Sequence, residues 1–373
     1  MFENLHTVNL DGTPYQRGLQ QAKRLPQLVP QVRAAVAGRL VGMRGALSSP
    51  RLARYLAQQQ AFLEAHDPDG FEESLGLAQG FSVSHPEILA YLHANVLQDM
   101  MQPAEPDVDG CTSWARRQAS GGCLVVKNRD YRGEHGVLQQ VFLHQGSGLE
   151  AGALLCVGSL GSPGAFSSGM NAQGLAVVDT QIGTHDHGVG WLRYFLMTAL
   201  LRKCATVSSA LSMIAAGPHA GGGTLVLGDA SGQCASVELS HARVSVVTRS
   251  ACFVARTNHF LQPELAAKMT KKADDLSASS AARLAQVEDS LSRANGEFGL
   301  AQAQALMSTH ETGASICSHA DATDMSRSRT LSCVVYDTAE KVLHMTSGNP
   351  CDSAWGSISL MQAAYLAQQS ANV

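Results

Sequence analysis

The sequence lacks the patterns that mark several large classes of protein. No stretch approaches 18 consecutive apolar residues, the length that a membrane-spanning helix requires. Lysine and arginine form no long run, and the formal net charge is −4, so a phosphate-reading surface for nucleic acid is not expected. No glycine-rich stretch continues into the Gly-Lys-Ser/Thr of a phosphate loop. We therefore expect neither a membrane nor a nucleic acid among its partners.

The cysteines also lack the spacing of known redox and metal motifs. Nine are present, but no two form Cys-x-x-Cys, which argues against a zinc ribbon and a thioredoxin-like site. The run His185, Asp186, His187 is a weak metal motif, because three adjacent residues rarely converge on one ion. Neither end of the sequence resembles a targeting signal. We expect a cytoplasmic protein with reduced thiols and no metal.

What is present is the composition of a globular protein, with 45% apolar and 16% charged residues in a chain of 373. Helical spacing predicts helices over 15–42, 49–66 and 85–101, with Ser49 and Ser84 as caps and with Pro26 and Pro30 as breaks or kinks. After a loop at 101–110, short β-rich segments follow, with a hairpin around 229–232. Helices are expected at 191–204, 206–217 and 279–294, and the end returns to a hairpin at 330–348. This order predicts a layered α+β fold.

One cysteine stands apart from the other eight. Most of the others lie in apolar, strand-like runs and are predicted to be small buried hydrophobic residues. Cys111 lies in the stretch "DGCTSW", where the helical part gives way to the β-rich part. If the bond between Gly110 and Cys111 were cut, the new α-amino group, with a pKa near ~7.7–8, would lie beside the thiol and could act as its base. A preceding glycine suits this cleavage, because it leaves the scissile carbonyl unshielded.

The chain resembles the acyl-coenzyme A:6-aminopenicillanic acid acyltransferase family of N-terminal-nucleophile (Ntn) cysteine hydrolases, the peptidase C45 type. The matching stretches run through most of the chain in the family's order: "GTPYQRGLQQA" (12–22), "SLGLAQGFSVSHPEILAYLHANV" (74–96), "GCTSW" (110–114), "SSGMNAQGLAVV" (167–178), "RTNHF" (256–260), "SICSH" (315–319), "SRSRTL" (326–331) and "GNP" (348–350). The resemblance implies the αββα four-layer Ntn sandwich with two antiparallel sheets. It also implies autocatalytic cleavage of a zymogen into a mainly helical α chain, 1–110, and a β chain, 111–373, which remain one structural domain.

The resemblance also implies roles for single residues. Cys111 would be the nucleophile, and its freed amine the general base. Asp130 would hold the resulting ammonium, and the side-chain amide of Asn258 would help to form the oxyanion hole. In "KNRD", Lys127 stands where the related bile-salt hydrolases and acid ceramidases carry arginine, so a bidentate substrate contact is not expected there.

Three further residues are expected to bind substrate or to assist processing. They are Ser113, two residues after the nucleophile, and the pair Ser326 and Arg327. The Ser-Arg pair recurs at 328–329, so its register stays open. The "SICSH" stretch, with Cys317, His319 and nearby Asp321, is interpreted as a family motif and not as a metal site.

Several alternatives remain open. The preferred hypothesis for the function is hydrolysis of a small N-acyl or aminoacyl amide through a Cys111 thioester. The alternative is transfer of the acyl group from a thioester or amide donor to an amine. No cofactor is expected, although a coenzyme A thioester could be a substrate. Cys111 could instead pair with His259 in an uncut, papain-like enzyme, or the chain could be a binding protein that keeps the fold without activity. The partners expected are the small-molecule substrate, the protein's own cleaved chain and, optionally, further copies in a higher oligomer.

Overall fold

The computed structural model describes residues 3–101, 110–242, 244–250, 252–270, 274–294, 298–320, 324 and 326–371. Most of the predicted loop at 101–110, and Asp321, lie outside the described residues. The helices are α1 (Pro14–Arg24), α2 (Val29–Val41), α3 (Arg44–Leu47), α4 (Pro50–His66), α5 (Pro68–Phe81), α6 (His85–Leu92), α7 (Ala94–Met101), α8 (Arg193–Lys203), α9 (Val207–Ala215), α10 (Pro263–Ala266), α11 (Asp274–Arg293), α12 (Leu300–Met307) and α13 (Leu360–Ala371), with 3-10 turns at Pro26–Leu28 and Gly133–Leu138.

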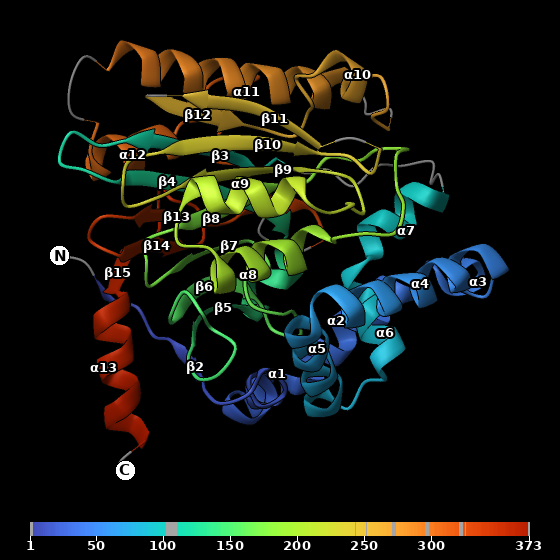
Figure 1. The fold of residues 1–373 in the computed structure, drawn as a ribbon. Coiled ribbons are helices and arrows are strands. Elements are labelled where there is room, and N and C mark those ends of the chain that lie inside the picture. The colour runs from blue at the N-terminus through green and yellow to red at the C-terminus, as the bar shows by residue number, and fades with distance from the viewer. Residues whose placement is uncertain are drawn as a thin grey trace.

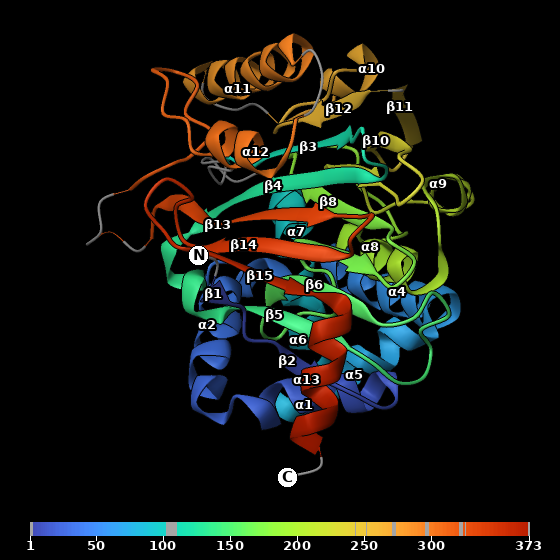
Figure 2. The ribbon, with the colours of Figure 1, turned by 90° about the vertical axis from the view of Figure 1, so that its left-hand side faces the viewer.

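The strands form two sheets that pack face to face (Figures 1 and 2). The seven-stranded sheet has the order β1 (Glu3–Asn4), β15 (Trp355–Ser359), β14 (Val342–Ser347), β13 (Ser328–Asp337), β4 (Cys123–Arg132), β3 (Thr112–Arg117) and β12 (Phe253–Arg256). The eight-stranded sheet has the order β11 (Val244–Ser250), β10 (Cys234–Leu239), β9 (Thr224–Gly228), β8 (Ala176–Thr180), β7 (Ser168–Asn171), β6 (Leu154–Ser159), β5 (Gln139–His144) and β2 (Val8–Leu10). Neighbouring strands are antiparallel, except that β1 joins β15 and β2 joins β5 in parallel.

Alternating side chains of the strands build the layers. In β3, Ala115 faces the apolar core between the two sheets, whereas Trp114 faces the core beneath α11 and α12. The outer face of the eight-stranded sheet is covered by α8, α9 and the N-terminal helices, which share a third apolar cluster (Figure 1). The order is therefore helix, sheet, sheet, helix, and the predicted αββα sandwich is confirmed.

The N-terminal segment differs in part from its prediction. Ser49 and Ser84 cap their helices as expected, each accepting a hydrogen bond from a backbone N–H. The predicted break at Pro26 is confirmed, because α1 ends before it. Pro30 was also predicted to break or kink the helix, but it fits the first turn of α2. Strands β1 and β2 lie in a segment predicted to be helical. Two- and three-residue edge strands are too short to show an alternating pattern.

The C-terminal segment also differs. The chain does not end on the hairpin of β13 and β14, but continues into β15 and α13. No helix among the described residues has the length and apolar character needed to cross a membrane.

Candidate active site

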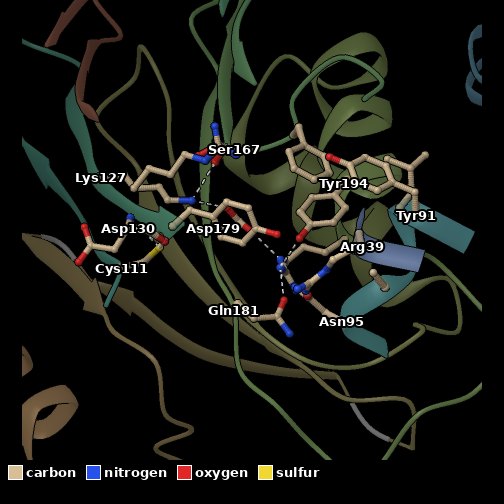
Figure 3. Close-up of a pocket in the computed structure, with 16 residues that line it drawn as sticks. Arg39, Tyr91, Asn95, Cys111, Lys127, Asp130, Ser167, Asp179, Gln181 and Tyr194 are labelled. Atoms are coloured by element: carbon tan, nitrogen blue, oxygen red, sulfur yellow. Dashed lines mark hydrogen bonds and ion pairs between the residues drawn. The ribbon is translucent and has the colours of Figure 1, made fainter. Parts of the chain in front are cut away.

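Cys111 lies immediately before β3, at the wall of a pocket that contains about 590 Å³ of space, part of it open to solvent. Its thiol is buried, with Sγ 3.4 Å from the backbone nitrogen of Asp130 and 3.6 Å from the Asp130 carbonyl oxygen. The antiparallel pairing of β3 with β4 produces this contact, since Thr112 lies opposite Asn128. Figure 3 shows Cys111 beside Asp130 and Lys127, across the pocket from Tyr91, Arg39 and Asn95.

The Asp130 carboxyl is fully enclosed beside the nucleophile. Its Oδ1 accepts a hydrogen bond of 2.7 Å from the Thr330 hydroxyl of the neighbouring strand β13, next to an irregularity in the register of that pair. Burial raises the pKa of Asp130 to about 6, against the lowering effects of the Thr330 bond and of the charges of Arg283 and Lys127. Asp130 therefore holds its proton more tightly in the folded chain than in the unfolded chain. Its contribution to the stability of the fold is complete below the pKa of an unfolded aspartate and is lost as the pH rises through about 6. A cation beside Asp130 would offset that loss.

Gly110 is packed against the same carboxylate. A Cβ added at Gly110 would lie 2.4 Å from Asp130 Oδ2, closer than such atoms approach. A larger residue before Cys111 would therefore force the junction or the Asp130 carboxylate to shift. Besides leaving the scissile carbonyl accessible, the glycine thus avoids a steric clash with Asp130.

Arg283, in α11, ties the junction to the oxyanion candidate. Its Nη1 donates to the carbonyl oxygens of Gly110 and Cys111, each at 2.7 Å, and to the Thr112 hydroxyl at 2.9 Å. Its Nη2 donates to Asn258 Oδ1 at 3.1 Å. Sequence reasoning missed this residue. The available signal was that Ser280 and Arg283 are polar residues on the helix face that also carries Leu284 and Val287 toward the core.

Asn258 is buried after β12 and is held at three points. Its backbone nitrogen donates to Ser280 Oγ at 2.9 Å, and its side-chain nitrogen Nδ2 donates at 2.9 Å to the carbonyl oxygen of Gln181, a residue that lines the pocket. The third contact is the one from Arg283. The structure therefore connects Cys111, Asp130 and Asn258 through β4 and Arg283.

Lys127 lies in the pocket wall as part of a buried charge network. Its Nζ is 2.5 Å from Asp179 Oδ1, and Arg193 Nε is 2.6 Å from Asp179 Oδ2. Burial alone would raise the pKa of Asp179, but the charges of Lys127 and Arg193 and their hydrogen bonds outweigh it and lower that pKa. Lys127 thus has a protein carboxylate as partner, and this network forms one side of the pocket (Figure 3).

The described residues that line the pocket include Cys111 and Asp130 but not Asn258, Ser113, Ser326 or Arg327. The Ser113 hydroxyl is buried and donates to the Arg256 carbonyl at 3.4 Å. Ser326 and Arg327 are exposed, and both contact Asp324. The alternative Ser-Arg pair at 328–329 lies closer to the site, because the next residue, Thr330, donates a hydrogen bond to Asp130.

The histidines weighed in the sequence lie elsewhere. No histidine is among the described residues that line the pocket. His259 Nδ1 is 2.8 Å from Ser280 Oγ. Asp186 and His187 have separate partners, since Asp186 bonds Lys268 and His187 bonds Asp99.

Comparison with known proteins decides the family. The model of the family described as acyl-coenzyme A:6-aminopenicillanic acid acyl-transferase matches residues 116–352, more than half of the chain. The chain belongs to this family. It is therefore an enzyme of the amide-hydrolase or acyltransferase kind. The match begins five residues after Cys111, so it does not itself include the nucleophile candidate.

Several solved structures are similar to this chain at low sequence identity. A variant of conjugated bile acid hydrolase from Clostridium perfringens is similar with a TM-score of 0.50 at 11% identity, over 67% of this chain and 93% of that one. An N-acylethanolamine-hydrolyzing acid amidase ortholog from Caenorhabditis elegans has a TM-score of 0.40 at 12% identity, over 61% and 93% of the two chains. Penicillin V acylase from Agrobacterium tumefaciens has 0.36 at 13%, over 64% and 83%. The bile acid hydrolase variant supports the fold. Comparison with curated proteins gave no match.

Proposed function

We propose that the chain is an autoprocessed Ntn cysteine amidohydrolase that cleaves a small N-acyl or aminoacyl amide through a thioester on Cys111. The observation that carries this proposal is the Gly110–Cys111 junction. A buried thiol at the pocket wall follows a glycine that packs on Asp130, and the carbonyl oxygen of that glycine accepts a 2.7 Å hydrogen bond from Arg283.

Processing would begin with attack of Cys111 Sγ on the Gly110 carbonyl carbon. The thiol proton passes to the amide nitrogen, the C–N bond breaks, and a thioester joins Gly110 to the sulfur. Arg283 stabilises the negative charge that develops on the Gly110 oxygen. Water then hydrolyses the thioester, which frees the Gly110 carboxylate, the thiol and the α-amino group of Cys111.

Turnover would repeat the same chemistry on a bound amide. The freed amine accepts the thiol proton and later gives it to the leaving amine. Asp130 supports this role, because a buried carboxylate with a raised pKa is stabilised by a neighbouring ammonium. Water hydrolyses the acyl-enzyme, or an amine accepts the acyl group in the transferase alternative. Asn258 supplies the amide donor to the oxyanion.

The two cleavage products would stay together. Strand β2 of the α chain is hydrogen-bonded to β5 of the β chain, and the apolar cluster on that sheet draws residues from both. The pocket is also shared, with Arg39, Tyr91 and Asn95 before the junction and Phe166 and Tyr194 after it. The Phe166 and Tyr194 rings, with centroids 4.1 Å apart, form an apolar wall that suits the acyl part of the substrate. The cytoplasmic location, the coenzyme A thioester substrate and a higher oligomer stay predictions.

Replacing Gly110 tests the fit of the junction. Gly110→Ala puts a methyl group against Asp130 and displaces the scissile carbonyl. Misplacement of reacting groups by about 1 Å can cost roughly 10²-fold in rate, so we expect cleavage to slow by that order. The conversion of freshly made precursor into two chains is followed by gel electrophoresis. Gly38→Ala is the matched control, since nothing lies within 4 Å of its added Cβ; equal cleavage rates in both variants would refute the steric argument.

Replacing Arg283 tests its contact with the scissile carbonyl. Loss of an oxyanion donor costs roughly 10²–10³-fold in rate, and Arg283→Met should slow precursor cleavage by that amount. Arg116→Met is the control, because Arg116 also bonds backbone carbonyls of the α11 region, at Leu291 and Ala294, but away from the junction. If Arg116→Met slows precursor cleavage equally, Arg283 acts only through packing of α11 and not through the scissile carbonyl.

The pH dependence of turnover separates the Ntn mechanism from the papain-like one. With an α-amino base, kcat/KM rises with pH as that group loses its proton, near a free value of ~7.7–8. His259→Gln should keep the shape of this profile in the processed enzyme, with a modest loss because His259 contacts Ser280 beside Asn258. If the ascending limb vanishes and the rate collapses, the base is His259.

A further inference from the structure

A second group of reactive side chains gathers away from the pocket. His310, Cys317, His319 and Cys351 each offer one ligand atom, and these four atoms all lie within 4.8 Å of one another. They come from two segments. Three of them follow α12, and Cys351 lies just after β14, more than thirty residues beyond His319 in the sequence. Only Cys317 is buried, so the cluster lies at the surface of the fold.

Three of the distances in this cluster, those among Cys317, His319 and Cys351, are close to the edges of a tetrahedron of zinc ligands. With Zn–S bonds of about 2.3 Å and Zn–N bonds of about 2.0 Å, two sulfur ligands are separated by about 3.8 Å and sulfur from nitrogen by about 3.5 Å. Cys317 Sγ is 3.7 Å from Cys351 Sγ and 3.7 Å from His319 Nε2, and His319 Nε2 is 3.2 Å from Cys351 Sγ. Two thiolates and two imidazoles are the donor set of many structural zinc sites.

The surroundings also fit a metal centre. A histidine ligand usually donates its other ring N–H to an oxygen, which fixes the tautomer. His310 Nδ1 lies 3.0 Å from the Cys317 carbonyl oxygen, which leaves Nε2 for the ion. Asn349 Nδ2 lies 3.2 Å from Cys317 Sγ and 2.7 Å from the Ser318 carbonyl oxygen. It can therefore donate to a thiolate and stabilise the ligand loop, the segment 317–319 that carries two of the ligands.

We propose that His310, Cys317, His319 and Cys351 bind one zinc ion as a structural Cys₂His₂ site. This differs from the sequence-based expectation of no metal, which assigned Cys317 and His319 to a family motif. Periodic spacing could not show the site, because its fourth ligand is distant in sequence. Binding would release the two thiol protons and would tie the segment after α12 to the segment after β14.

The zinc site would stabilise the hydrogen bonds that hold the Asp130 carboxylate in place. The Ser318 backbone nitrogen donates to Thr330 Oγ1 at 2.8 Å, and the Thr330 nitrogen donates to the Ser318 carbonyl at 2.9 Å. Thr330 Oγ1 in turn donates to Asp130 Oδ1. The ion would therefore stabilise the ligand loop and the β13 segment beside the pocket, without contacting substrate.

Metal content and a cobalt spectrum of the full chain test the site. The protein, purified with a reducing agent and dialysed, should contain one zinc per chain by elemental mass spectrometry. Removal of zinc by a chelator should lower the Tm, and Co²⁺ should then give intense tetrahedral ligand-field bands with thiolate charge transfer. Cys317→Ser and Cys351→Ser should retain less than about a tenth of the metal, and Asn349→Ala should bind zinc roughly 10–100-fold more weakly.

Cys252→Ser is the matched control, because Cys252 is an exposed cysteine outside the cluster; it should keep one zinc per chain. The wild-type cobalt spectrum keeps the test decisive even if a ligand variant fails to fold. Two results would overturn the proposal. One is a wild-type protein that binds no cobalt with thiolate charge transfer. The other is a reduced wild-type protein that retains no zinc after zinc is added and the protein is dialysed.

Discussion

Cys111→Ala should remain a single uncut chain with no measurable turnover. The substitution removes the only atom that the mechanism uses to attack, both at the Gly110 carbonyl and at the substrate. Loss of a nucleophile costs on the order of 10⁴–10⁶-fold in kcat, which is the largest effect that the account predicts. Gel electrophoresis reports the chain state, and release of amine from a panel of N-acyl amides reports turnover.

The matched control is Cys252→Ala, which removes an exposed cysteine away from the pocket. It should process and turn over at the wild-type rate. A Cys111→Ala protein that is cut at the same bond would show that another protease or nucleophile performs the cleavage. Cleavage together with normal turnover would remove Cys111 from the mechanism altogether.

Asn258→Ala should lower kcat by roughly 10²–10³-fold, the usual cost of one oxyanion donor. Asn258→Asp should be at least as damaging, because it places a negative charge where the anion develops. Processed protein is required for both, and the measurement is steady-state kinetics with the unfolding midpoint recorded alongside.

A stability loss must be separated from this kinetic loss. Asn171 is an equally buried asparagine whose Nδ2 donates to the carbonyls of Leu201 and Cys204. Asn171→Ala should therefore lose stability, about 1–3 kcal/mol for buried partners left unsatisfied, while the folded enzyme keeps its kcat. If Asn258→Ala behaves in the same way, Asn258 only supports the structure.

Local patterns predicted much of the fold. The caps at Ser49 and Ser84, the amphipathic face of α11 and the hairpin of β9 and β10 are each specified by residues within a few positions of one another, and the structure contains them. The short strands β1 and β2 were not predicted, because they pair with β15 and β5, which are far away in sequence. Parallel edge pairs of two or three residues leave no local signal.

The candidate site divides in the same way. Gly110 and Cys111 were recognisable from an unusual junction, and Asp130 was implied by the family resemblance; the structure brings the three into contact. The role of Arg283 was not predicted, since its hydrogen bonds to the Gly110–Cys111 junction cross more than 170 residues of sequence, and its polar place on an amphipathic helix face was only a weak signal. Ser326 and Arg327 form the first of two consecutive Ser-Arg pairs. The sequence alone does not decide whether this pair or the one at 328–329 corresponds to the family motif.

The central claim is that the bond between Gly110 and Cys111 is cut by the protein itself. Intact mass spectrometry of purified wild-type protein, with N-terminal sequencing of each species, measures this directly. We expect two chains, of which the larger begins Cys-Thr-Ser-Trp and is absent from a parallel preparation of Cys111→Ala. An active wild-type preparation that contains only the uncut chain of 39.4 kDa would contradict this claim.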